Sequence, residues 1–333
     1  MKNKKPPFEI TERMIADIAD ICELVGRISI SGRQSPQLRK TNRIRTIYSS
    51  LAIEQNTLDI EQVTAVISGK HVLAPPKDIA EVKNAYEIYE HMDMLDPYDM
   101  NDLLKAHKIM MQGLTQDAGE FRSKPVGVVD SGGKILHFGT LPQYVPQLVE
   151  ELLGWTKKSA LHMLIKSCVF HYEFEVIHPF SDGNGRCGRL WHTLLLSQWN
   201  PVFAWLPIET LIRERQDAYY DDQDKYYEAI NISNAQAEST VFIEFMLSVI
   251  MAALKESDGV RMPEKKSRMD MICEYLKNHE YIANSDVQTL LSVSSATATR
   301  ILAEAVKSGI AVKVRIGSHW GYKKVEEERL HIH

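Results

Sequence analysis

The chain has 333 residues, of which 44% are hydrophobic and 25% charged, and a formal net charge of −5. This composition is typical of a globular protein with room for two or three domains, and the acidity argues against wholesale nucleic-acid coating. No run approaches the roughly 20 apolar residues of a membrane span. Four scattered cysteines without a Cys-x-x-Cys pair indicate neither a zinc site nor a disulfide framework. With a basic N-terminal tip that lacks an apolar run, they predict a cytoplasmic protein.

Most of the chain carries apolar residues at helical spacing. Residues 8–30 predict an amphipathic helix opened by Thr11 and Glu12, and a polar turn with Pro36 near its end precedes a second helix at about 38–54. Further helices are expected within 59–77 and at about 79–92, 100–113, 145–155, 160–176, 208–232 and 240–256. The methionines around residues 92–94 and 110–111 are interpreted as core filling. The predicted fold class is mainly α.

One hairpin interrupts the helices. Over Val126–Phe138, β-branched runs flank the Ser131-Gly132-Gly133 turn, which is typical of two antiparallel strands. The helix at 160–176 has the wide apolar face of a central buried helix. It delivers the chain to His178.

The stretch from His178 to Arg189, HPFSDGNGRCGR, has the composition of a nucleotide site. Its three glycines permit backbone angles and close approaches that a Cβ would block. The segment from Gly185 to Ser197 contains no proline and predicts a helix. Because the first amides of a helix lack partners and its dipole is positive there, the turn that opens this helix is an anion pocket.

Four side chains add chemistry to this pocket. Arg186 and Arg189, three apart on one helical face, are forked donors suited to phosphate oxygens. Asp182 supplies a hard carboxylate of the kind that holds Mg²⁺ beside phosphates. His178 is the nearby group whose ordinary pKa suits proton abstraction near neutrality.

These residues resemble the signature of the Fic family, His-Pro-Phe-x-Asp/Glu-Gly-Asn-Gly-Arg-x-x-Arg, with every fixed position present. The resemblance implies a Fic fold, a helical bundle with a β-hairpin flap, and a protein adenylyltransferase that moves AMP from ATP to a Ser, Thr or Tyr hydroxyl. It implies that His178 is the base and Asp182 the Mg²⁺ ligand. The residues it implies for nucleotide binding within the signature are Asp182, Gly183, Asn184, Gly185, Arg186, Cys187, Gly188 and Arg189, with Asn184 and Gly185 in the anion hole and Cys187 at a variable position.

Two further segments resemble parts of the same family. Ser50–Asn56 (SLAIEQN) is similar to the inhibitory motif Ser/Thr-x-x-x-Glu-Gly/Asn, which implies that Glu54 binds Arg189 and blocks the γ-phosphate of ATP. Gln55 departs from the motif, which has Gly or Asn at that position. The segment with Tyr226, Tyr227 and Asn234 resembles the adenine pocket, although packing of a helix interface explains Tyr226 about equally well.

The hairpin and its lead-in Ala118–Arg122 resemble the family's flap, which aligns a target protein as an added strand. We also expect self-modification and homodimer formation, and we expect no membrane partner. A polar linker near residues 257–266 precedes three short helices and two alternating segments around Gly317-Ser318, the pattern of a winged helix. The expected domains are 1–99 with the inhibitory helix, 100–258 as the Fic core and 259–333 as the winged helix.

The winged-helix segment leaves its partner open. Residues 296–324 hold six basic residues and one acidic residue, which suits DNA phosphates, but the third helix offers few base-reading side chains near its start. Protein docking or dimerisation fits equally. A second hypothesis for the whole chain is a DNA-binding regulator whose Fic core only senses nucleotide. Within enzymes, transfer of another nucleotide or removal of AMP stays open.

Overall fold

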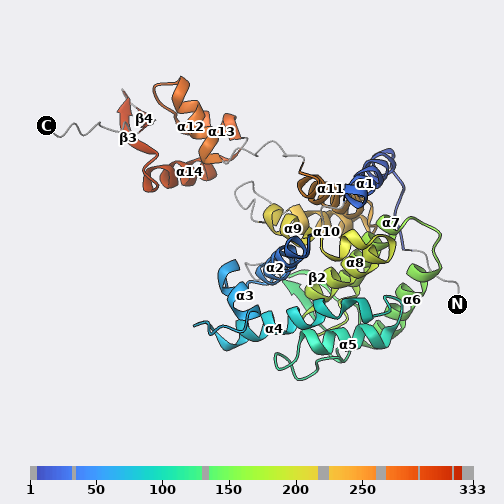
Figure 1. Cartoon of the computed structure of the whole chain (residues 1–333). Helices are drawn as coiled ribbons and strands as arrows, with labels where there is room; N and C mark the ends of the chain where they lie inside the picture. The colour runs from blue at the N-terminus through green and yellow to red at the C-terminus, as the bar shows by residue number, and fades with distance from the viewer. Residues whose placement is uncertain are drawn as a thin grey trace. The chain divides into compact units, whose positions relative to one another are not determined.

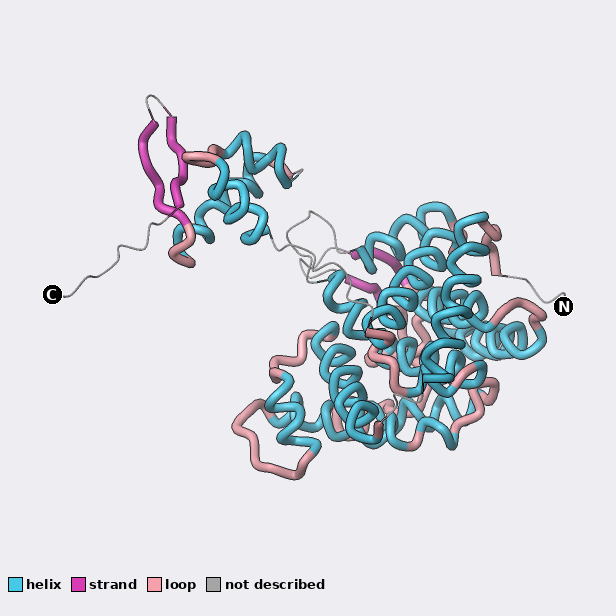
Figure 2. The backbone as a smooth tube through the Cα atoms, turned by 45° about the horizontal axis from the view of Figure 1, so that its top comes forward, coloured by secondary structure: helices cyan, strands magenta, loops and turns pink. Residues whose placement is uncertain are grey.

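The computed structural model describes residues 6–31, 35–129, 135–216, 225–259, 268–291, 293–316 and 319–324. Within these ranges the chain is mainly helical, with two short antiparallel hairpins (Figure 2). It divides into two compact units, a larger one that runs to Val260 and a smaller one that begins at Arg261. The expected boundary at residue 99 lies inside the larger unit, where helices from both sides of it pack together.

The larger unit contains eleven α-helices among its described residues (Figure 1). The helices are α1 (Glu12–Ser31), α2 (Pro36–Ile53), α3 (Ile60–Ile67), α4 (Pro76–Glu90), α5 (Met100–Met110), α6 (Val145–Lys158), α7 (Met163–Ile177), α8 (Asn184–Trp199), α9 (Ile208–Gln216), α10 (Lys225–Gln236) and α11 (Thr240–Ser257). Three 3₁₀ turns accompany them: η1 (Met92–Met94), η2 (Pro142–Tyr144) and η3 (Pro201–Ala204). None of the described helices is long and apolar enough to cross a membrane.

Helix α2 begins two residues before the expected start. Ser35 accepts a hydrogen bond from the backbone N–H of Leu38, and Pro36 occupies the first helical position. Proline fits there because the first N–H of a helix has no partner in the helix anyway. For the same reason α4 begins at Pro76, earlier in the chain than the expected start at about residue 79.

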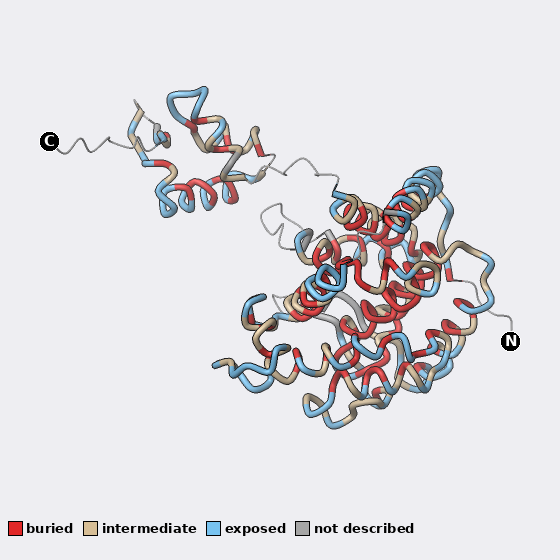
Figure 3. The backbone as a smooth tube through the Cα atoms, in the orientation of Figure 1, coloured by how far each residue is buried: buried red, intermediate tan, exposed pale blue. Residues whose placement is uncertain are grey.

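The core of the larger unit centres on α7 and α8, which pack against each other (Figure 3). Phe170 and Phe174 of α7 and Trp191 of α8 are fully buried. The expected central helix therefore carries the chain through the middle of the bundle. The prediction of methionine core filling holds for Met92, Met110 and Met111 but is wrong for Met94, which is 72% exposed in the short turn η1.

The predicted hairpin is present as β1 (Gly127–Val129) and β2 (Ile135–Phe138), which pair antiparallel. Gly127 lies opposite Phe138, and the register shifts between Val128 and Val129. The Ser-Gly-Gly turn lies outside the described residues. The hairpin enters and leaves the bundle beside the end of α7, because Arg122 and Thr140 are both tied to that point.

The smaller unit has its own apolar core. Its elements are α12 (Arg268–Asn278), α13 (Asn284–Leu291), α14 (Ser295–Lys307), β3 (Ala311–Ile316) and β4 (His319–Lys324). Helix α14 is capped by Ser294, whose hydroxyl accepts from the N–H of Thr297. Strands β3 and β4 pair antiparallel from Ala311 opposite Lys324 to Ile316 opposite His319. The element order is the one expected from the sequence.

Candidate active site

His178 ends α7 in a conformation that few residues adopt. Its φ of 51° lies in the left-handed region, and its N–H still donates to Phe174 O. This reversal turns the chain out of the bundle and leaves the imidazole 18% exposed. Nδ1 lies 3.3 Å from the carbonyl oxygen of Glu175. Since a carbonyl only accepts, the contact assigns the ring proton to Nδ1 and leaves Nε2 as the basic nitrogen.

The loop after His178 is closed by Asn184. The Asn184 Oδ1 accepts from the N–H of Phe180 at 2.8 Å, and its Nδ2 donates to Phe180 O at 2.9 Å. Both ends of the amide are thus used to hold the loop. Any part that Asn184 plays in an anion hole therefore falls to its backbone N–H.

Gly183 caps α8 with a φ of 81°. A Cβ at this position would lie 2.6 Å from Met111 Sδ, so both the backbone angle and the space require glycine. The first amides of α8, beginning at Asn184, follow directly. They have no partners within the helix, and the helix dipole is positive at this end, so the turn suits a phosphate.

Arg186 is held by two carboxylates. Its guanidinium contacts Asp182 Oδ1 at 3.2 Å and Glu81 Oε1 at 3.3 Å, with 4% of the side chain exposed. Glu81 in turn accepts from Asn56 Nδ2 at 2.8 Å. Within the described residues Arg186 Nε has no hydrogen-bond partner. One hydrogen-bond donor of Arg186, a residue expected to bind phosphate, is therefore unsatisfied among the described residues.

Arg189 is bound by residues at the end of α2, and Glu54, the partner expected for it, is one of them. Its guanidinium donates to Glu54 Oε1 at 2.8 Å, to Ser50 Oγ at 3.0 Å and to Ser50 O at 2.9 Å. The Arg189 side chain is 2% exposed and that of Glu54 29%. Gly185 makes room for the pair, since a Cβ there would collide with Glu54 Oε1. In this arrangement the Arg189 guanidinium is occupied by its hydrogen bonds to Glu54 and Ser50.

Gln55 explains how the departure from the inhibitory motif is tolerated. Its φ is 65°, and its N–H donates to Ala52 O while the N–H of Asn56 donates to Leu51 O. This left-handed helix ending favours Gly or Asn, and another L-residue costs roughly 1–2 kcal/mol there. The chain accepts that strain, and α2 still ends with Glu54 directed at Arg189.

Glu175 lies behind the loop, between His178 and Arg189. Its side chain is 14% exposed, and Oε2 is 4.0 Å from His178 Nδ1. Burial raises the pKa of Glu175 to about 7, against the opposing effect of Arg189 and with a smaller contribution from Glu54. Gly188 allows this approach, because a Cβ there would lie 2.8 Å from Glu175 Oε1. Cys187 is fully buried, which leaves only its backbone for nucleotide contact.

Two residues that support the loop were missed by the sequence reasoning. Arg122, 3% exposed, donates to the carbonyl oxygens of His178, Ile177, Lys124 and Thr140, so it ties the base of the hairpin to the end of α7. His107 stacks on Phe180 with ring centroids 3.6 Å apart and donates from Nε2 to Asp182 O. Its Nδ1 accepts from the N–H of Gly119, which fixes the tautomer. Only the lead-in around Arg122 gave any signal.

The residues expected in the adenine pocket occupy different environments. Tyr226 is 2% exposed, and its hydroxyl lies 3.1 Å from His171 Nε2, so it packs in the core. Tyr227 is half-buried and meets the Tyr226 ring edge-on. Asn234 Oδ1 accepts from the Tyr172 hydroxyl at 2.9 Å and lines a cavity of about 400 Å³ on the side of α7 that faces α6.

The residues around the loop fit a magnesium ion that is bound partly by the protein and partly by phosphates. Asp182 has 51% of its side chain exposed beside the α8 turn, and carboxylate oxygen is the ligand type that Mg²⁺ prefers. In the part of the chain that the structure describes, no three His, Cys, Asp or Glu side chains gather as a metal cluster. An ion here would therefore depend on the phosphates and water for its other ligands.

Comparison with known proteins gives a consistent result. Residues 97–196 match the model of the Fic/DOC family. The chain is 24% identical over 240 residues to protein adenylyltransferase fic-1 of Caenorhabditis elegans, covering 68% of this chain and 43% of the relative. It is 26% identical to protein adenylyltransferase Fic of Nematostella vectensis, covering 60% and 45%. The chain thus spans less than half the length of these curated relatives.

Solved structures agree over a larger share of the chain. A Fic family protein from Desulfovibrio desulfuricans G20 is 37% identical, with a TM-score of 0.73 over 97% of this chain and 99% of that one. A Fic domain containing signaling protein from Bacteroides thetaiotaomicron has a TM-score of 0.59 at 20% identity, covering 74% of this chain and all of the other. The second likeness concerns the fold alone.

Proposed function

Because the chain belongs to the Fic family, we propose that it is a protein adenylyltransferase that transfers AMP from ATP to a Ser, Thr or Tyr hydroxyl of a target protein. The observation that carries the proposal is the placement of the His178 imidazole at the end of α7, directly before the amide turn that opens α8. A base and an anion pocket thus lie within one short loop. The names of the curated relatives support the choice of AMP as the transferred group.

In the proposed reaction His178 acts as general base. Nε2 takes the proton of the target hydroxyl, whose oxygen attacks the α-phosphorus of ATP. The bond from that phosphorus to the bridging oxygen breaks, and pyrophosphate leaves. Because Nδ1–H is held by Glu175 O, the imidazole presents the basic nitrogen in a fixed orientation.

The turn at the start of α8 stabilises the charge on the phosphates. Backbone amides that already point at the site of developing charge stabilise that charge more than water does, because they need not reorient during the reaction. Bound Mg²⁺ supplies further neutralisation of phosphate charge, and Asp182 is the residue that would hold it. Arg186 and Arg189 are the cations for the remaining phosphate oxygens.

We further propose that the arrangement described above is the inhibited state. Glu54 occupies the guanidinium of Arg189, which the γ-phosphate needs for a productive pose. A target segment would add to the edge of the β1–β2 hairpin and place its hydroxyl near His178. Self-modification follows where a hydroxyl of the chain itself reaches that position.

Labelled nucleotides test the reaction class. We expect the purified chain, with Mg²⁺, to label itself or added protein with [α-³²P]ATP and not with [γ-³²P]ATP, and His178→Ala to abolish the label while ATP still binds. Label from the γ-position would instead indicate phosphate transfer, and preferential label from UTP would indicate uridylylation. Full labelling by His178→Ala would refute the assignment of the base.

For the smaller unit we propose a winged helix that binds nucleic acid. Support comes from Arg300, Lys307, Lys313 and Arg315, which are all exposed on α14 and β3. Trp320 is 56% exposed, with Lys313 Nζ 4.7 Å from its ring centroid. If the unit instead docks protein, its affinity for DNA will be undetectable or insensitive to salt.

A further inference from the structure

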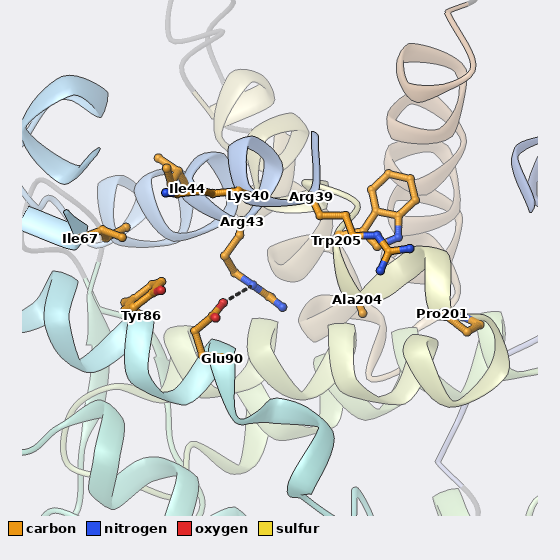
Figure 4. Close-up of a pocket in the computed structure, with 10 residues that line it drawn as sticks. All are labelled: Arg39, Lys40, Arg43, Ile44, Ile67, Tyr86, Glu90, Pro201, Ala204 and Trp205. Carbon is orange, nitrogen blue, oxygen red and sulfur yellow. Dashed lines mark ion pairs between the residues drawn. The ribbon is translucent and has the colours of Figure 1, made fainter. Parts of the chain in front are cut away.

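The basic side chains of this chain differ in how far carboxylates neutralise them. Arg43 borders a cavity of about 520 Å³ between α2, α4 and η3, and its Nε lies 3.5 Å from Glu90 Oε1 (Figure 4). On the β3–β4 hairpin of the smaller unit, by contrast, Lys313 and Arg315 are exposed and pair with no carboxylate of the described residues. Two cations on one strand without a counter-charge attract anions.

An exposed indole lies beside these two cations. Arg315 of β3 is directly opposite Trp320 of β4, and directly opposed side chains project from the same face of a sheet. Lys313, two residues before Arg315, projects from that face as well, and its Nζ lies 4.7 Å from the centre of the Trp320 ring. Trp320 is 56% exposed and takes no part in the core of the smaller unit. We call this surface, made of Lys313, Arg315 and Trp320, the wing face.

The start of α14 is engaged by contacts within the smaller unit. In the proposed winged helix this is the part that would meet base edges in the major groove of a duplex. Ser295 Oγ donates to Asn284 Oδ1 at 3.1 Å, and Thr299 Oγ1 accepts from Asn284 Nδ2 at 2.9 Å. Arg300 is a long basic donor near this start, but Glu304, four residues on, carries a charge that repels phosphates. These side chains therefore suit the reading of a duplex poorly.

We propose that the wing face binds single-stranded nucleic acid, with an unpaired base stacked on the Trp320 indole and adjacent phosphates bound by Lys313 and Arg315. This inference rests on the nucleic-acid binding proposed for the smaller unit, and it names the surface and the form of the ligand. Every base has a flat π-face, so an exposed ring can stack on any sequence once the base is unpaired. A stacked base is held more strongly than an exposed ammonium group, so the base displaces Lys313 Nζ from the ring and the ammonium group turns to a phosphate.

Stacking is tested by fluorescence anisotropy with the full chain and a fluorescein-labelled oligothymidylate of about 12 nucleotides, a usual site size. We expect saturable binding at low salt that weakens by about fivefold or more in Trp320→Leu, which keeps an apolar side chain but loses the flat ring. This variant folds because Trp320 lies outside the core. Unlabelled oligothymidylate should also quench the tryptophan fluorescence of wild type and not that of Trp320→Leu.

An aromatic residue on the opposite face of the hairpin provides the matched control. Tyr281 is 39% exposed, and its ring lies where a side chain at Gly321 would project. Because Gly321 follows Trp320 in the strand, that direction is opposite to the wing face. Tyr281→Leu should therefore bind oligothymidylate as wild type does.

The salt dependence of binding tests the two cations. For a single strand, each neutralised phosphate contributes about 0.7 to the slope of log K against log salt concentration. Lys313→Ala and Arg315→Ala should each lower the slope by about that amount. Lys83→Ala, which removes an exposed lysine of α4 in the larger unit, is the control and should leave the slope unchanged.

The form of the ligand is tested with oligothymidylate, oligouridylate and the duplex of oligothymidylate with oligodeoxyadenylate. We expect at least one single strand to bind more tightly than the duplex, and the tighter one identifies DNA or RNA as the source. Equal affinity of Trp320→Leu and wild type overturns the wing face, as does tighter binding to a duplex that Arg300→Ala weakens and Trp320→Leu does not. Nucleic-acid binding by the smaller unit then still stands. If no nucleic acid binds even at low salt, that proposed function fails together with the wing face.

Discussion

Replacing Glu54 by glycine tests the proposed inhibition directly. The change removes the carboxylate that lies 2.8 Å from Arg189 and leaves that guanidinium, 2% exposed, for the γ-phosphate. A hydrogen bond to a charged group contributes about 1.5–3 kcal/mol, and each 1.4 kcal/mol or so is a factor of ten. The rate of self-adenylylation should therefore rise roughly tenfold to a hundredfold.

The assay is the initial rate of label transfer from [α-³²P]ATP at saturating ATP and Mg²⁺. Glu54→Gln keeps the bulk but not the charge and should give an intermediate rate. Glu61→Gln, at an exposed position of α3, is the matched control and should match wild type. Without nucleotide, Glu54→Gly should melt at a lower temperature than wild type, because Arg189 loses its counter-charge. Equal rates for Glu54→Gly and wild type, with both binding ATP, would refute the reasoning.

Three other predictions concern stability and the smaller unit. The pKa of Glu175 is raised from 4.5 to about 7 in the folded chain, so this group makes the free energy of unfolding fall as the pH rises across that window. The Tm of Glu175→Gln should therefore exceed the Tm of wild type by more at pH 8 than at pH 5. Parallel pH profiles of Tm for the two proteins would contradict this. Gln55→Gly should relieve the left-handed strain and raise the free energy of unfolding by about 0.5–1 kcal/mol, measured by urea titration, whereas a loss of stability would show that Gln55 makes a contact worth more than the strain. Deleting residues 261–333 should leave a cooperatively folding, ATP-binding chain, and any DNA affinity, measured by fluorescence anisotropy, should move with the removed fragment and fall steeply with salt.

Local patterns were enough to predict the helices, the hairpin and the loop from His178 to Arg189. Helical spacing repeats over many residues, and the signature is contiguous, so both can be read without knowing what packs where. The errors at Pro36 and Pro76 come from treating proline as a breaker where it serves as a first helical residue. Met94 is exposed because a short 3₁₀ turn presents only part of its surface to the core.

The supports of the site could not be predicted in this way. Glu81 reaches Arg186 across 105 residues, and His107 reaches Asp182 across 75. Neither carries a local signal, since an isolated glutamate or histidine on a helix is ordinarily a surface or core residue. Their partners are decided by the packing of α4 and α5 around α8, which is a property of the whole bundle.

The contacts of the two signature arginines also bear on how the chain is made. Glu54 leaves the ribosome 135 residues before Arg189, and Glu81 leaves it 105 residues before Arg186. Helices α2 and α4 have therefore already been synthesised when the residues of α8 leave the ribosome. The proposed nucleotide pocket therefore cannot form before the segment that carries Glu54 has been synthesised. Under the proposed inhibition, each newly made molecule folds directly into the inhibited arrangement, and AMP transfer requires a later release of Arg189 from Glu54.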